Sequence, residues 1–279
     1  MRTLLRWIPT LLCLLLTLSA FAEQQRRKPK KKVNKDLVKV QKLAEEYLAC
    51  AKEKKAECME AILGKLKKHK QLSCEELVGH LETNKLHVHV GVGRALAGMK
   101  CEAGIEVALD LLQLPDWEHK AETAITFAAS KDKRLLTPLM NLAEKGARPY
   151  HRESACKALA EMGMEDAVPA LVKASGHAMF SVRLAAAQAL AKFATPAART
   201  RLCKMLESDD NAGVKVESAK ALGTHKQMAA VPCLSKGLND PVGLVQTASH
   251  EALKEATGLD LGLNPISWGQ WYDKEINQR

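Results

Sequence analysis

The stretch "VRLAAAQAL", residues 182–190, decides the fold of this chain. It holds four alanines, two leucines and one valine behind a single arginine, and no group that could do chemistry. Five related stretches occur elsewhere: "VHVGVGRAL" (88–96), "HKAETAITF" (119–127), "HRESACKAL" (151–159), "VKVESAKAL" (214–222) and "VQTASHEAL" (245–253). Their last residues follow one another at intervals of 31, 32, 31, 32 and 31 residues. This regular period predicts a repeat architecture.

A second apolar segment follows each copy. A leucine recurs twelve residues after the end of a copy, at Leu139, Leu171, Leu202 and Leu234, with Leu109 in the first unit, and a proline precedes it at Pro138, Pro169 and Pro232. Proline is tolerated in the first turn of a helix, so each unit is predicted to be a helix A, a short turn and a helix B. One such pair cannot bury its apolar faces alone, so the pairs are predicted to stack.

The pattern resembles HEAT-like repeats, in particular the short bacterial kind first noted in phycobilin lyases. The resemblance covers roughly residues 86–258 and lies in "VRLAAAQAL", in "AVPAL" (167–171) and in "VQTASHEAL" after Asp240-Pro241-Val242. The Val-Arg pair usual in such repeats is kept only at Val182-Arg183. The resemblance implies an all-α, right-handed α-solenoid of stacked two-helix repeats of 31–32 residues, used for protein interaction, with the B helices on the concave side.

The two ends depart from the repeat. Residues 36–85 are predicted to form an irregular N-terminal helical cap, because their apolar pattern is helical but out of register. Residues 259–279 are predicted to form a C-terminal aromatic cap over the last helix pair, built on Trp268, Trp271 and Tyr272, although an aromatic ligand-binding cluster is the alternative.

The first 22 residues are predicted to be a signal peptide. An apolar run follows Arg2 and Arg6 and ends at Ala20-Phe21-Ala22, which offers the small residues that a signal peptidase needs. The mature protein would then be periplasmic or secreted. Because a basic run follows the apolar one, an uncleaved membrane anchor is the alternative.

Residues 23–35 are predicted to be a disordered basic tail. Seven cations stand against Glu23 alone, a net charge of +6: Arg26, Arg27, Lys28, Lys30, Lys31, Lys32 and Lys35. The tail could contact an anionic surface or polymer, or serve as a solvated linker.

Cysteines point to disulfides in an exported chain. Spacing predicts Cys50–Cys58 and Cys74–Cys101 bridges in the N-terminal third, the first of which fails if residues 36–69 form one unbroken helix. Cys156 takes the small-residue position of Ala187 and Ala219 and is predicted to be buried and inert.

No catalytic constellation is found. The pair His87-x-His89 would point to different sides of a helix, and zinc-ligand spacings are lacking. We therefore predict no catalytic residue, no metal and no cofactor.

One register position suggests a binding surface. Fourteen residues past each copy, on helix B, the chain carries Asp110, Asn141, Lys173, Lys204 and Lys236, with Arg201 beside them. This B column is predicted to bind a partner on the concave side, or else to serve only as solubilising charge.

The function predicted from the sequence is a non-catalytic scaffold or adaptor. It would be a monomer that binds another protein and needs no small-molecule substrate. The alternatives are a binder of nucleic acid or another anionic polymer through the tail and the B column, and a lyase-type HEAT enzyme.

Overall fold

A computed structural model describes residues 35–81, 85–115 and 118–277, and within these ranges every regular element is a helix. The predicted signal peptide and all of the basic tail except Lys35 lie outside the described residues. The α-helices are α2 (Lys35–Lys52), α3 (Ala56–Leu66), α4 (Lys70–Val78), α5 (Leu86–Met99), α6 (Glu102–Gln113), α7 (Lys120–Ala128), α8 (Leu136–Lys145), α9 (Pro149–Met162), α10 (Val168–Ala174), α11 (Phe180–Leu190), α12 (Pro196–Ser208), α13 (Ala212–Thr224), α14 (Val231–Gly237), α15 (Gly243–Thr257) and α16 (Pro265–Asn277).

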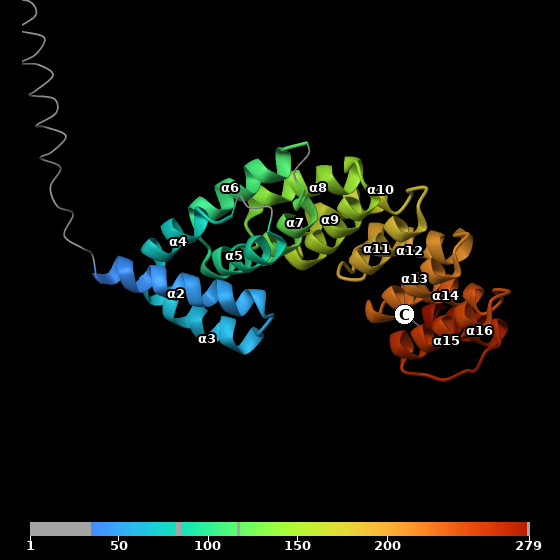
Figure 1. Ribbon diagram of the computed structural model, residues 1–279. Coiled ribbons are helices and arrows are strands. Elements are labelled where there is room, and N and C mark those ends of the chain that lie inside the picture. The colour runs from blue at the N-terminus through green and yellow to red at the C-terminus, as the bar shows by residue number, and fades with distance from the viewer. Residues whose placement is uncertain (1–34, 82–84, 116–117, 278–279) are drawn as a thin grey trace, which may run out of the picture.

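The helices form two parallel rows, as the repeat requires. The six copies of the opening stretch fall in α5, α7, α9, α11, α13 and α15, which are the A helices, and the segments between them form the B helices α6, α8, α10, α12 and α14. Each helix packs against the next one in its own row (Figure 1). The predicted all-α solenoid of stacked helix pairs is thereby confirmed.

The B helices begin where the prolines predicted. Pro169 and Pro232 are the second residues of α10 and α14, and Pro138 is the third residue of α8. A turn of 3-10 helix leads into each of these three helices: η3 (Lys133–Leu135), η4 (Glu165–Ala167) and η5 (Met228–Ala230). Leu139, Leu171, Leu202 and Leu234 are all fully buried between the rows.

The A helices approach one another closely because small residues face their contacts. Ala187 and Ala219 are fully buried. At Gly223 a Cβ atom would lie 2.8 Å from the Cα atom of Ala252 on the next A helix, so even a methyl group would push α13 and α15 apart. Alanine and glycine therefore set the spacing of this row.

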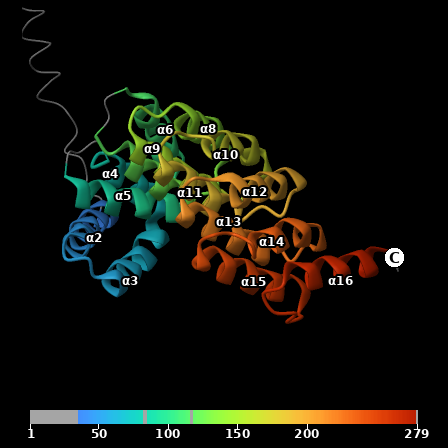
Figure 2. The ribbon, with the colours of Figure 1, turned by 90° about the vertical axis from the view of Figure 1, so that its right-hand side faces the viewer.

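The stack bends into an arc, and its direction overturns one prediction. Figures 1 and 2 show the A helices along the inner edge of the arc and the B helices along the outer edge. The resemblance implied the reverse, with the B helices on the concave side. The physical reason is that successive A helices are in closer contact with one another than successive B helices are, so the stack curves toward its A side.

The N-terminal segment continues both rows and adds one helix. Helix α2 packs against α5, and α4 packs against α6. Helix α3 is the addition, and it packs on α2. The chain turns sharply between α2 and α3, where Lys54 adopts a positive φ of 56°. Residues 36–69 are thus not one helix.

The C-terminal aromatic segment forms a helix that completes the last pair, with α15 as its A helix. Helix α16 packs against α14 and so takes the place of a B helix after α15. Trp268 is fully buried, and its Nε1 donates a hydrogen bond to the carbonyl oxygen of Gly262 at 2.8 Å. The Trp271 ring meets it edge-on, with centroids 6.1 Å apart, and Trp271 and Tyr272 are half-buried against the core.

Ion pairs tie the loops between repeats to the A helices. Arg183 of α11 donates to both carboxylate oxygens of Asp209, at 2.8 Å each, and also to Asp210 and to the carbonyl oxygens of His177 and Ala178. One repeat further on, Lys215 pairs with Asp240 at 2.7 Å. Because Arg183 and Asp209 expose only 12% and 6% of their side chains, solvent screens this pair little.

We expect Asp209→Ala to lower the free energy of unfolding by about 3 kcal/mol, because it leaves the buried guanidinium of Arg183 without its main partner. Asp210→Ala is the matched control. The Asp210 side chain is 87% exposed, so its loss should change stability by no more than about 0.5 kcal/mol. Urea unfolding of both variants gives the comparison, and equal effects would contradict this role for the buried pair.

The same pair makes stability depend on pH in acid. Burial alone would raise the pKa of Asp209, but hydrogen bonds from Arg183 and from the amide of Asn211 outweigh it and hold the pKa below its usual range. Because the folded-state pKa is the lower one, the contribution is complete above about pH 4 and is lost as the pH falls through the folded pKa. The acid stability curve of Asp209→Ala should therefore be flatter than that of the wild type.

Candidate functional site

The two faces of the arc differ in what they expose. Among the described residues, one large apolar side chain is exposed on each of five A helices: Leu86, Ile125, Tyr150, Phe180 and Leu244. The B helices from α6 to α14 expose none, whereas α16 at the end of that row exposes Ile266 and Ile276. Phe180 is 52% exposed and Leu244 is 73% exposed. We call the exposed surface of α5, α7, α9, α11, α13 and α15 the inner face.

The B column lies on the opposite, outer edge. Asp110, Asn141, Lys173, Lys204 and Lys236 are all exposed, one on each B helix from α6 to α14, as the register predicted. Their placement on the concave side is wrong, because the B helices follow the outer edge of the arc (Figure 1).

Carboxylates of neighbouring helices neutralise part of the B column. Lys173 pairs with Glu144 of α8, and Lys236 pairs with Glu207 of α12 at 3.0 Å. The two lysine side chains stay 65% and 70% exposed, so each pair contributes little to stability. It nevertheless removes net charge from the column. The outer edge therefore does not carry a continuous basic stripe.

Arg201 has a structural position. It lies half-buried on α12, and its guanidinium donates to the hydroxyl and, at 2.7 Å, to the carbonyl oxygen of Ser175 at the end of α10. It thus caps the carboxyl end of the preceding B helix. A cation that satisfies a helix end in this way is not directed toward a partner.

The histidines of the suspected pair point apart, as the helical spacing requires. His87 is exposed. His89 is fully buried, with Nε2 2.8 Å from the Thr123 hydroxyl and Nδ1 2.9 Å from the Leu81 carbonyl oxygen. Burial lowers the pKa of His89, partly opposed by its contact with that carbonyl. Within the part of the chain that the structure describes, no group of three or more His, Cys, Asp or Glu side chains is placed to hold a metal.

Three pairs of cysteines lie at disulfide distance. Cys50 and Cys58, across the turn at Lys54, have Cα atoms 5.9 Å apart, and Cys74 and Cys101 have theirs 5.8 Å apart. The third pair joins Cys203 of α12 to Cys233 of α14, with Cα atoms 5.6 Å apart. The sequence analysis missed it, although a signal was present: 30 residues separate the two cysteines, nearly one repeat, so they lie side by side on adjacent B helices.

Cys156 is the free cysteine of the described residues. It is fully buried in α9, at the position that alanine occupies in α11 and α13. Burial, with a smaller contribution from Glu153, raises the pKa of its thiol to about 12. Because the thiolate is the reactive form of cysteine, we expect Cys156 to be unreactive in the folded protein.

A thiol titration tests this arrangement. We expect a purified chain of residues 23–279, without reductant, to show no thiol that reacts with Ellman's reagent while folded and one after unfolding in guanidinium chloride. Peptide mapping should place that thiol at Cys156, whose burial explains the protection. Seven reactive thiols in the unfolded protein would contradict all three pairs.

No helix among the described residues combines the length and apolar character that crossing a bilayer requires.

Known proteins resemble the chain in fold. No curated protein sequence matches it. Human deoxyhypusine hydroxylase in complex with glycerol matches at 17% identity and a TM-score of 0.41, over 80% of this chain and 97% of that one. The complex of CpcE and CpcF of phycocyanin lyase from Nostoc sp. PCC7120 matches at 19% identity and a TM-score of 0.41, over 83% and 94% of the two chains. An engineered protein matches at 20% identity and a TM-score of 0.38. Because every one of these TM-scores is below 0.5, these matches carry no argument about this chain.

One family matches by sequence. Residues 136–217, from α8 into α13, match the family model of HEAT repeats. This confirms the resemblance inferred from the opening stretch, which lies inside the match.

Proposed function

We propose that the protein is a non-catalytic scaffold or adaptor that binds another protein along its inner face. The observation that carries this proposal is the contrast between the faces. Five A helices each expose a large apolar side chain, while the B helices from α6 to α14 expose none. A protein partner that covers exposed apolar side chains on successive helices would gain by removing them from water.

The side chains of the outer edge are less available to a partner than those of the inner face. Its lysines are exposed but partly paired with glutamates, and Arg201 is engaged by Ser175. Binding there would require breaking these contacts, whereas the apolar residues of the inner face would gain by leaving water. The inner face, and not the B column, is therefore the proposed binding surface. The chain would act as a monomer and would need no small-molecule substrate.

Paired inner-face and outer-face variants test this function. We expect Ile125→Glu with Phe180→Glu to lose the partners that the wild type retains in affinity purification from the native envelope, because a carboxylate cannot leave water for an apolar contact. The matched control is the triple variant Lys173→Glu, Lys204→Glu, Lys236→Glu on the outer edge, which should keep them.

Both variants should first be shown to unfold with the same midpoint as the wild type. The reverse result, with partners lost only from the outer-edge variant, would overturn the proposal and favour an anionic partner of the B column.

We further propose that the protein works outside the cytoplasm. Three cysteine pairs at disulfide distance suit an oxidising compartment, and the sequence begins with a signal-like segment. We expect the mature protein in the periplasmic or secreted fraction with Glu23 as its first residue, as read by N-terminal sequencing. An intact Met1 in the membrane fraction would favour the anchored alternative.

A further inference from the structure

We propose that a cavity at the N-terminal end of the inner face is the anchor site for the partner, and that it receives one large apolar side chain from an acidic, extended segment of that partner. The inference rests on the proposed function and names the kind of segment that would be bound. The cavity has a volume of about 520 Å³ and lies between the end of α2, the start of α3 and α5.

The walls of the cavity are apolar. Ala51, Met59, Leu86 and Val90 line it, and Gly91 contributes backbone alone. A Cβ atom at Gly91 would lie 2.8 Å from the Cβ of Ala51, so α2 and α5 touch there and close the bottom of the cavity. Nothing polar in this part would be left unpaired when an apolar side chain enters, so burial of that side chain would be favourable.

The mouth of the cavity is basic. Lys54, His87 and Arg94 are its charged or titratable lining residues, all three are exposed, and no acidic side chain lines the cavity among the described residues. The nearby carboxylate of Glu53 is engaged by Lys55 at 2.5 Å. An apolar group flanked by carboxylates is thus complementary to this site in both shape and charge.

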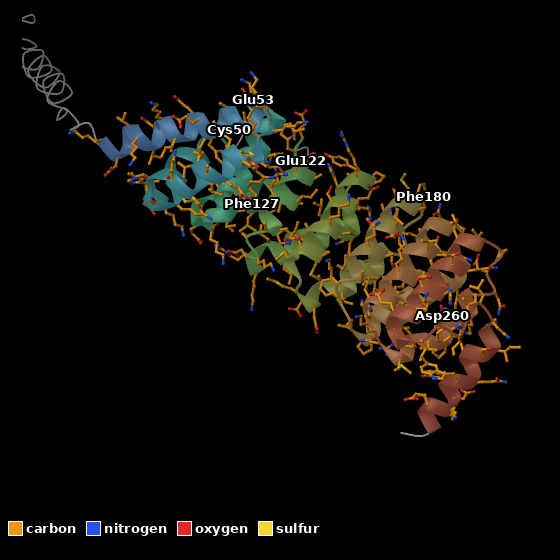
Figure 3. The ribbon with its side chains drawn as sticks, turned by 90° about the horizontal axis from the view of Figure 1, so that it is seen from below. Cys50, Glu53, Glu122, Phe127, Phe180 and Asp260 are labelled. Carbon is orange, nitrogen blue, oxygen red and sulfur yellow. A yellow bond between two sulfur atoms is a disulfide. The ribbon has the colours of Figure 1, made fainter. Side chains whose placement is uncertain are left out.

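The turn that carries Lys54 is held in place. Cys50 and Cys58 bracket it at disulfide distance, and Figure 3 shows Cys50 and Glu53 together at this end of the molecule. A wall fixed before binding loses less conformational entropy when the partner arrives. We therefore expect this wall to have the same shape before and after binding.

The surroundings favour a peptide over a small apolar anion. Leu86 lies at the start of its A helix, and Tyr150 and Phe180 lie at the same place on α9 and α11. Stacked helices lie about 8–10 Å apart, and an extended chain advances about 3.3 Å per residue. An extended segment anchored in the cavity would thus meet a new A helix at about every third residue, whereas a small ligand would use the cavity alone.

A random 12-residue peptide library displayed on phage and selected on the full mature chain tests the proposal. We expect the enriched peptides to share a large apolar residue with Asp or Glu close by. A fluorescein-labelled consensus peptide should bind at least tenfold more weakly to Val90→Trp, which fills the cavity, and at least fivefold more weakly to Arg94→Glu. Raising the salt concentration should weaken its binding to the wild type.

Thr247→Trp provides the matched control. Thr247 stands at the same helical register in α15 as Val90 in α5, and it is exposed on the inner face. This variant should bind the consensus peptide within twofold of the wild type. Thermal unfolding followed by circular dichroism shows whether each variant is folded.

The remaining outcomes separate this proposal from the proposed function. Binding that resists Val90→Trp but is lost in Ile125→Glu with Phe180→Glu overturns the anchor site and leaves the inner face as the binding surface. Binding that resists every inner-face variant overturns both. If dodecanoate binds in a manner that Val90→Trp abolishes while no peptide is enriched, the cavity takes a small apolar anion and the peptide anchor is overturned.

Discussion

The close contact between successive A helices is the constraint on which the rest of the structure depends. Gly223 leaves no room for a methyl group against Ala252, and Ala187 and Ala219 are fully buried. Successive helices of the outer row are in less close contact with one another. Each repeat is consequently a wedge with its thin side inward, and a stack of wedges must curve toward the thin side. Curvature, and with it the identity of the inner face, follows from side-chain volume.

The loops between repeats keep the wedges in register. Helix packing by small residues is permissive, because alanine surfaces can slide along one another with little change in contact. The ion pairs of Arg183 with Asp209 and of Lys215 with Asp240 fix each loop to the A helix of its own repeat. This gives the Val182-Arg183 pair in the opening stretch a specific purpose. The valine fills the core, while the arginine holds the next loop at a set distance.

Features that depend on spacing along the chain were predicted correctly from the sequence. Features that depend on side-chain volume or on contacts between helices were not. The period of 31–32 residues, the prolines that begin the B helices and the burial of Cys156 all follow from positions along the chain. Which row lies inside does not, because both rows share the same period. The Cys203–Cys233 pair was not predicted because its members take different register positions. Cys203 follows Leu202, whereas Cys233 precedes Leu234. The inner-face residues were missed as well, because single exposed apolar side chains become a surface only when the helices are stacked.

The cysteine pairs show how such a surface can be held ready. Solenoid repeats touch only their neighbours, so bending accumulates along the stack unless something limits it. Cys74 and Cys101 connect α4 to the start of α6, and Cys203 and Cys233 connect α12 to α14, so both links lie in the outer row toward the two ends. A disulfide at either pair would limit the separation of neighbouring outer-row helices, and neither pair lies on the inner face. Disulfides at these two pairs would stiffen the proposed interaction surface from the outer side and would lower the conformational entropy lost on binding.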